Sequence, residues 1–135
     1  MLFRSSSSVI CDFLRSGFRL RDRQMTVLEI MTTIEMNDAL LVYLSSCDSA
    51  RPVVGRTEEL MALARSFLYA GSPTVIASLW PLDDNAGRVF AENFYKAWLS
   101  DRMSLNRSFQ SALLRTMIME PDPLCWAPFI MVGAW

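Results

Sequence analysis

The chain has 135 residues and a formal net charge of −1 at pH 7, because 13 Lys and Arg residues stand against 14 Asp and Glu residues. This length suits one domain with a single core, and scattered, balanced charge excludes the basic surface that a nucleic-acid partner requires. Hydrophobic residues make up 52% and charged residues 20% of the chain, a globular composition that excludes disorder, and no apolar run of roughly 18 residues is present to span a membrane.

The first segment, residues 1–23, differs in composition from the rest of the chain. It contains a serine run at residues 5–8 and arginines that include Arg4, Arg15 and Arg19. Such a composition is superficially typical of an organellar transit peptide. The plainer alternatives are a flexible leader, or the start of a chain that has lost an upstream part, and we favour the second. The predicted domain is therefore placed at residues 24–135.

Thr26 opens the first predicted helix. Thr26 and Glu29 have the spacing of a capping box, and Met25 and Ile30 are placed for the hydrophobic staple. The pattern predicts a helix from residue 27 to about residue 36. The run at residues 40–44 is apolar without alternation, which is typical of a strand covered on both faces by helices.

A polar segment at residues 45–56, which contains Cys47, follows this strand. Its proline and glycine indicate a surface loop. Thr57 then predicts the start of a second helix, which runs to residue 70 and ends at Gly71. The second strand is predicted at residues 73–79, where the sequence is again too apolar to have a solvent-exposed face.

The remaining elements follow the Trp80-Pro81 pair, which ends the second strand. Apolar residues recur at helical spacing through residues 85–99, and a third long helix begins after Ser104 and ends before Pro121. The apolar run at residues 129–132 predicts a third strand, and Pro128 favours an edge position for it. The order of elements predicts an α/β fold with a sheet of about three mostly parallel strands and flanking helices.

Functional residues of open α/β sheets gather at the carboxyl ends of the strands. Cys47 follows the first strand, and Asp83 and Asp84 follow the second. The plain alternative for Cys47 is an inert cysteine, since free cysteine is among the most buried residue types. The plain alternative for Asp83 and Asp84 is capping of the next helix.

The chain contains three cysteines, Cys11, Cys47 and Cys125, and no histidine. Their wide spacing, without a Cys-x-x-Cys pair, does not form a common zinc site. We therefore expect no metal or other cofactor. An odd number of unpaired cysteines favours a reducing compartment, and we expect a cytoplasmic protein.

Four blocks follow one another along the chain: LVYLSSC at residues 41–47, ELMALARSFLYAG at 59–71, VIASLWPLDD at 75–84 and WAPFIMVG at 126–133. In this order they resemble the C-terminal half of the CHAT domain, a family of caspase- and separase-like cysteine peptidases. The resemblance runs from about Leu20 to Trp135. The resemblance implies a partial caspase-like sandwich at residues 24–135, with the first strands missing.

The resemblance also assigns a role to Cys47, which matches the nucleophile of the family's Cys-His dyad. Ser46 replaces the family's alanine, and Ala50 replaces a glycine where the loop turns. The family's histidine precedes this block in a His-Gly motif that the chain does not contain. A further His-Pro pair of the family corresponds to Asp122-Pro123.

Two functions follow as expectations. The first is a caspase-like cysteine endopeptidase domain that is inactive as this chain because the dyad histidine is absent, with Asp83 and Asp84 binding a basic substrate residue. The alternative is a non-catalytic protein-interaction or regulatory module, a pseudopeptidase. The expected partners are a protein or peptide substrate, or a protein partner, with helical-repeat modules in a longer chain. Whether the chain is an enzyme stays open at this point.

Overall fold

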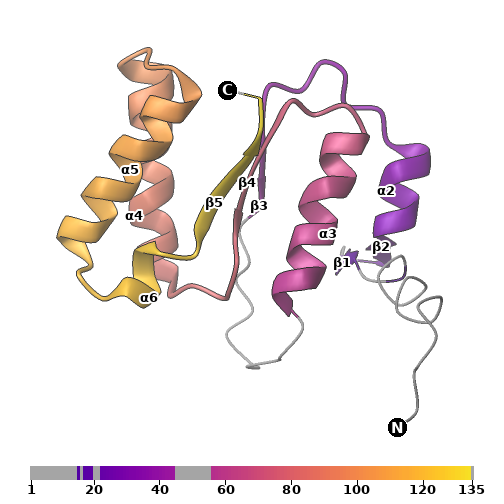
Figure 1. Ribbon diagram of the computed structural model, residues 1–135, viewed down its shortest axis with the longest axis horizontal. Coiled ribbons are helices and arrows are strands. Elements are labelled where there is room, and N and C mark those ends of the chain that lie inside the picture. The colour runs from indigo at the N-terminus through magenta and orange to yellow at the C-terminus, as the bar shows by residue number, and fades with distance from the viewer. Residues whose placement is uncertain (1–14, 16, 20–21, 45–55, 135) are drawn as a thin grey trace, which may run out of the picture.

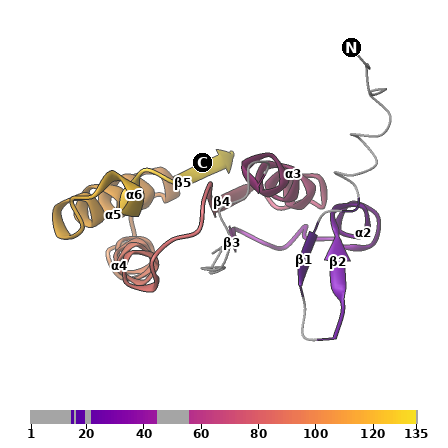
Figure 2. The same cartoon turned by 90° about the horizontal axis from the view of Figure 1, so that it is seen from below.

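The computed structural model describes residues 15, 17–19, 22–44 and 56–134 and shows a mixed α/β architecture (Figure 1). A three-stranded sheet has the order β3-β4-β5, and a separate two-stranded hairpin is formed by β1 and β2. Helices α2 and α3 lie on one side of the central strand, and α4 and α5 lie on the other (Figure 2). The α/β class and the flanking helices agree with the sequence prediction.

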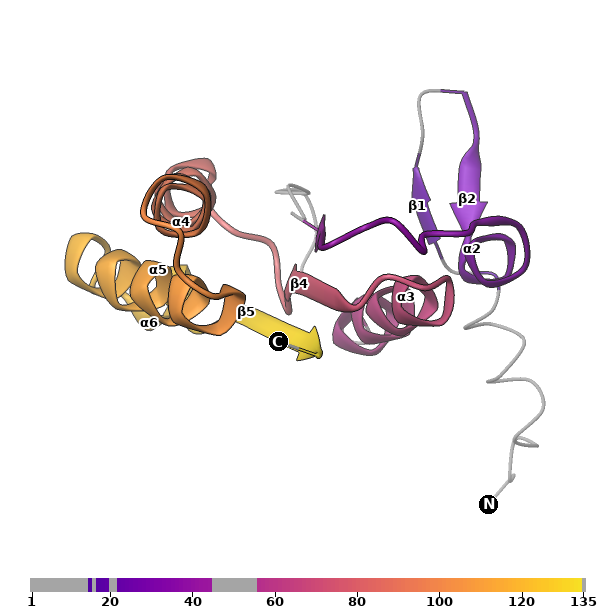
Figure 3. The same ribbon diagram turned by 90° about the horizontal axis from the view of Figure 1, so that it is seen from above.

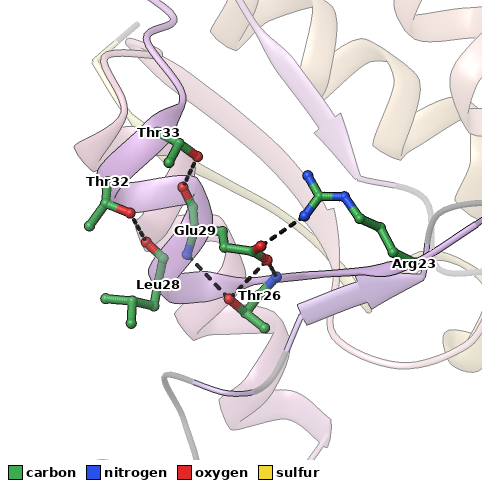
Figure 4. Close-up of polar contacts among 6 residues, drawn as sticks. All are labelled: Arg23, Thr26, Leu28, Glu29, Thr32 and Thr33. Carbon is green, nitrogen blue, oxygen red and sulfur yellow. Dashed lines mark hydrogen bonds and ion pairs between the residues drawn. The ribbon is translucent and has the colours of Figure 1, made fainter.

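The hairpin pairs β1, Gly17–Arg19, with β2, Gln24–Thr26, in antiparallel register. This hairpin was not predicted from the sequence, and β1 lies within the segment at residues 1–23. Helix α2, Val27–Thr33, begins as predicted with a complete capping box. Figure 4 shows Glu29 bonded to the Thr26 backbone N–H at 2.8 Å, while the Glu29 N–H donates to the Thr26 hydroxyl at 3.2 Å.

Helix α2 ends earlier than the predicted residue 36. Ile34 is already extended, with φ −99° and ψ 128°. The backbone N–H of Met36 donates to the carbonyl of Ala70 at 2.7 Å instead of to its own helix. This long-range hydrogen bond, which the local sequence does not predict, connects the segment after α2 to the end of α3.

Strands β3, Val42–Leu44, and β4, Thr74–Ser78, are parallel and are joined through α3, Arg56–Tyr69. All five side chains of β4 are buried, as predicted for a strand without a solvent-exposed face. The end of α3 is a Schellman motif, in which Ser72 N–H donates to Phe67 O and Gly71 N–H to Leu68 O, both at 3.1 Å. Gly71 has φ 107°, so the predicted glycine stop is confirmed.

The second half of the chain contains two long helices and the last strand. Helix α4, Asp84–Tyr95, continues as a π-helical turn, η1, over Lys96–Ser100, and α5 spans Leu105–Met119. Ser104 is the N-cap position of α5, but its side chain makes no capping bond. A short helix that was not predicted, α6, Pro123–Trp126, precedes β5, Phe129–Gly133.

Strand β5 is antiparallel to β4, with Ser78 opposite Phe129 and Thr74 opposite Gly133. The prediction of mostly parallel strands is therefore corrected, because β3 and β4 alone are parallel in the described sheet. The reason is the pair of helices between β4 and β5. Helix α4 carries the chain away from the carboxyl end of β4, and α5 returns it to the same end (Figure 1).

The core is divided by β4 into two clusters. Val75 belongs to the cluster formed with α2 and α3, while Ile76 belongs to the cluster formed with α4, α5 and β5. The division follows from the strand geometry, in which successive side chains project to opposite faces. The second cluster is rich in aromatic rings, with Phe90, Phe94 and Phe129 all buried.

Candidate functional site

The carboxyl ends of β3 and β4 define the candidate site. Leu44 lies beside Ala77 in the parallel register, so both strands end at the same edge of the sheet (Figure 1). The chain leaves β3 toward residues 45–55. Cys47, the predicted nucleophile, lies in that segment and therefore outside the described residues.

The segment after β4 is held against the start of β5 and against α6. The backbone N–H of Leu79 donates to the carbonyl of Pro128 at 2.9 Å, and the indole N–H of Trp80 donates to the carbonyl of Leu124 at 3.0 Å. Leu82 is buried in the aromatic cluster. These contacts fix the position of the segment that leads into α4, and so the position of Asp83 and Asp84 at the start of that helix.

Asp83 and Asp84 lie at this edge as expected, and both are exposed. Asp83 is the N-cap of α4, and its carboxylate accepts a hydrogen bond from the backbone N–H of Asn85 at 3.2 Å. Asp83 therefore caps α4, as the plain alternative for this residue expected. Asp84 is the acidic residue of the first helical turn, where a negative charge complements the helix dipole.

Two further carboxylates, neither of them predicted from the sequence as a site residue, lie at the same edge. Glu120 is the C-cap of α5 and accepts a hydrogen bond from the side-chain amide of Asn85. Asp122 caps α6 by accepting from the N–H of Leu124 at 3.0 Å. The signal for Asp122 was present in the sequence, since an acidic residue before a proline is a common helix start.

Three of these carboxylates influence the pKa of one thiol, that of Cys125. Partial burial raises the pKa of the Cys125 thiol above its ordinary value, and the negative charges of Asp122, Glu120 and Asp83 raise this pKa further. The three carboxylates come from the starts of α6 and α4 and from the end of α5. The Cys125 thiol is therefore held in its neutral form at pH 7, which disfavours its action as a nucleophile.

Asp83, Asp84, Glu120 and Asp122 lie at this edge, and the Arg88 guanidinium that bonds Asn85 there is already paired with Glu92. The chemistry that this edge favours is therefore the binding of a cationic group. Within residues 15–44 and 56–134, excluding the masked positions, no group of three or more His, Cys, Asp or Glu side chains is arranged to hold a metal ion. Among the described helices, none combines the length and the apolar character needed to cross a membrane.

Comparisons with known proteins identify similar sequences. The family model of the CHAT domain matches residues 4–134. The chain is 32% identical over 95 residues to tetratricopeptide repeat protein 28 of Mus musculus, which covers 70% of the chain and 4% of the relative. It is 27% identical over 116 residues to tetratricopeptide repeat protein 28 of Homo sapiens, covering 85% of the chain and 5% of the relative. No solved structure matches the chain significantly.

Proposed function

The chain belongs to the CHAT domain family, and we propose that it is a protein-binding domain that does not hydrolyse peptide bonds by itself. The observation that carries the proposal is a CHAT domain sequence with Cys47 in the position of the nucleophile and no histidine among its 135 residues. We further propose that the described sheet and helices form part of a caspase-like sandwich.

The proposed lack of catalysis follows from the chemistry of an unassisted thiol. A cysteine with an ordinary pKa near 8.5 is only a few per cent thiolate at pH 7. Amide cleavage also requires a proton donor for the leaving amine, a role that histidine usually fills. Asp48, the residue after Cys47, carries a negative charge that opposes thiolate formation.

The proposed binding role is supported by the relatives. Both are named for the tetratricopeptide repeat, a helix–turn–helix unit that stacks into arrays, and the chain spans 4% and 5% of their lengths. We propose that the domain works beside helical-repeat modules and contacts protein partners. Cys125 is a free cysteine, which fits a reducing compartment, and a cytoplasmic location is part of the proposal.

The second candidate function is one half of a cysteine endopeptidase, active when another segment or a partner supplies the histidine. It is favoured by the negative edge described above, which suits a basic side chain of a peptide substrate. Cys47 is the nucleophile in this mechanism, and its own backbone N–H contributes to the oxyanion hole. Asp83 and Asp84 bind the basic residue.

A combined alkylation and cleavage experiment separates the two functions. The full chain is treated with iodoacetamide at pH 7, and the modified cysteines are quantified by mass spectrometry alongside free glutathione. We expect Cys47 to react no faster than glutathione, and we expect peptides with arginine or lysine before the scissile bond to remain intact. Cleavage that Cys47→Ala abolishes would overturn the non-catalytic proposal.

The role of the carboxylates is tested separately if cleavage is found. Asp84→Asn keeps a polar residue in the first turn of α4 and removes one negative charge. The endopeptidase function predicts that this variant loses preference for lysine or arginine relative to neutral residues. An unchanged preference would remove Asp84 from the substrate site, and Asp83→Asn, which retains a capping side chain, applies the same test to its neighbour.

A further inference from the structure

Helix α5 has an apolar outward surface that no described element covers. Its residues Ser108, Ala112 and Thr116 are fully buried against the rest of the fold. On the opposite side of the helix, Leu114 is 49% and Ile118 is 74% exposed. Figure 3 shows α5 at the outside of the molecule, next to α4.

The exposed residues follow the helix spacing. Counting along the helix, Arg107, Gln110, Leu114 and Ile118 are separated by three or four positions and so lie on one face. All four are exposed, and Met117 beside them is 38% exposed. We call this set of residues, Arg107, Gln110, Leu114, Met117 and Ile118, the α5 outer face. A lone exposed leucine is ordinary, but clustered apolar residues on one helix face indicate a contact surface.

The charges on α5 indicate the chemistry of the partner. The helix contains Arg107 and Arg115 and no acidic residue between Leu105 and Met119. Within the part of the chain that the structure describes, neither guanidinium forms an ion pair. The two charged side chains within α5 are therefore both cationic, whereas Glu120, at the C-cap of the helix, is hydrogen-bonded to Asn85. An acidic partner complements the two arginines.

The shape of the surface indicates the conformation of the partner. A stripe on a single straight helix is matched by the apolar stripe of a second amphipathic helix, with anchors at helical spacing. Met117 contributes a flexible thioether side chain, which adapts to differently shaped apolar residues. These features favour a helix over an extended strand, because α5 offers no unpaired backbone for strand addition.

We propose that the α5 outer face binds an acidic amphipathic helix of a protein partner. This inference rests on the proposed function, and it identifies the surface through which the domain binds its partner. Leu114 and Ile118 supply the apolar contact, and Arg107 and Arg115 select partners that carry carboxylates beside their apolar stripe. Exposed ion pairs contribute little to affinity, so the arginines determine preference and the apolar residues determine most of the binding strength.

The test uses the full chain and two synthetic peptides. Both peptides form amphipathic helices of about five turns with the same leucine stripe, and glutamates flank the stripe in one while lysines flank it in the other. Binding is measured by calorimetry, and hydrogen exchange locates the protected amides. We expect the glutamate peptide to bind at least about fivefold more tightly than the lysine peptide and to protect α5.

Two variants complete the test. Leu114→Gln combined with Ile118→Gln is expected to lower the affinity for the glutamate peptide by at least about tenfold. A loss of this size is on the order of that caused by removing one buried apolar side chain. The matched control, Leu28→Gln combined with Leu40→Gln, alters exposed apolar residues on other elements and is expected to bind unchanged. Circular dichroism verifies that both variants keep the native helix content.

Three results of the binding measurements would overturn the inference. They are no binding of the glutamate peptide at about 1 mM, equal affinity for the two peptides, and equal weakening by the control variant. Sedimentation that shows self-association through Leu114 and Ile118 would assign the surface to a second copy of the chain and would also overturn it. The cleavage assay of Cys47 is independent of these measurements, so failure of the proposed function is distinguished from failure of the binding surface.

Discussion

The rings of Phe90 and Phe129 are stacked, with centroids 3.8 Å apart and planes 11° from parallel. Phe90 belongs to α4 and is fully buried, and Phe129 is the first residue of β5. Phe90 also contacts Phe94 and Phe109 through their rings, at centroid distances of 6.2 and 5.5 Å. Phe90 therefore joins α4, α5 and the edge of the sheet in one aromatic cluster.

Phe90→Ala is expected to lower the free energy of unfolding by about 3–5 kcal/mol, because it removes a buried ring and leaves a cavity. Urea denaturation followed by circular dichroism measures the loss. Tyr95→Ala is the matched control, since Tyr95 also has ring neighbours but is 38% exposed. A loss at Tyr95 as large as that at Phe90 would contradict the assignment of Phe90 to the centre of this cluster.

Gly71→Ala is expected to destabilise the fold by about 2 kcal/mol, since a side chain at φ 107° is strained. A Cβ at Gly71 would also lie 2.6 Å from Oδ1 of Asn37. Gly87→Ala in α4 is the control, because a Cβ there meets no heavy atom within 4 Å. It is expected to stabilise the fold by about 0.5–1 kcal/mol through helix propensity, and thermal unfolding of both variants would show opposite shifts.

Asp122→Asn is expected to accelerate the alkylation of Cys125 at pH 7 to 8. The substitution removes one of the negative charges that raise the pKa of the Cys125 thiol, so a larger fraction of the thiol ionises, while asparagine preserves the helix cap. Mass spectrometry of Cys125 modification against pH measures the change. Asp101, the C-cap of η1, is not among the charges that raise the pKa of Cys125. Asp101→Asn is therefore expected to leave the rate unchanged, and equal acceleration by both variants would refute the local electrostatic cause.

Glu29 is expected to make the stability of the fold depend on pH in the acidic range. The hydrogen bond from the Thr26 backbone N–H, with those from the Thr26 and Arg23 side chains, lowers the pKa of Glu29 below its ordinary value of 4.5. A lowered pKa in the folded state means that the stabilisation is complete above the ordinary pKa and is lost as pH falls through the folded-state pKa.

Glu29→Gln tests this contribution, because glutamine can still complete a capping box but does not ionise. The unfolding midpoint is measured in urea at several pH values between about 3 and 7, a range that spans the reference pKa of glutamate. We expect the variant to show a shallower decline than the unaltered chain as the pH falls. Glu35→Gln, an exposed position in the loop after α2, is expected to reproduce the decline of the unaltered chain, and an identical decline in Glu29→Gln would rule out the capping carboxylate as its source.

The elements that the sequence predicted well have strong local signals. The start of α2 was readable from Thr26 and Glu29, because a capping box depends on residues within one helical turn. The end of α3 was readable from Gly71, because the required backbone conformation favours glycine. Asp83 and Asp84 were correctly placed after β4, because the Trp80-Pro81 pair marks the end of the apolar run before them.

The features that the sequence did not predict depend on distant partners. The direction of β5 is set by the return path through α5, and no residue of the strand itself carries that information. The early end of α2 depends on the bond between Met36 and Ala70. The environment of Cys125 depends in part on Asp83, which is 42 positions away in the sequence and is brought to the same edge by tertiary packing.

The division of the core by β4 has a consequence for how this gene can change. Val75 and Ile76 are neighbours in the chain but belong to different clusters, so loss or gain of a single codon within β4 would exchange the two sets of side chains. Side chains that now pack in the aromatic cluster would then face α3, and those that now pack against α3 would face Phe90. Substitution of one apolar residue for another in this strand is therefore expected to persist in related genes. An insertion or deletion of one residue is expected to be removed by selection, because it disrupts the packing of both clusters.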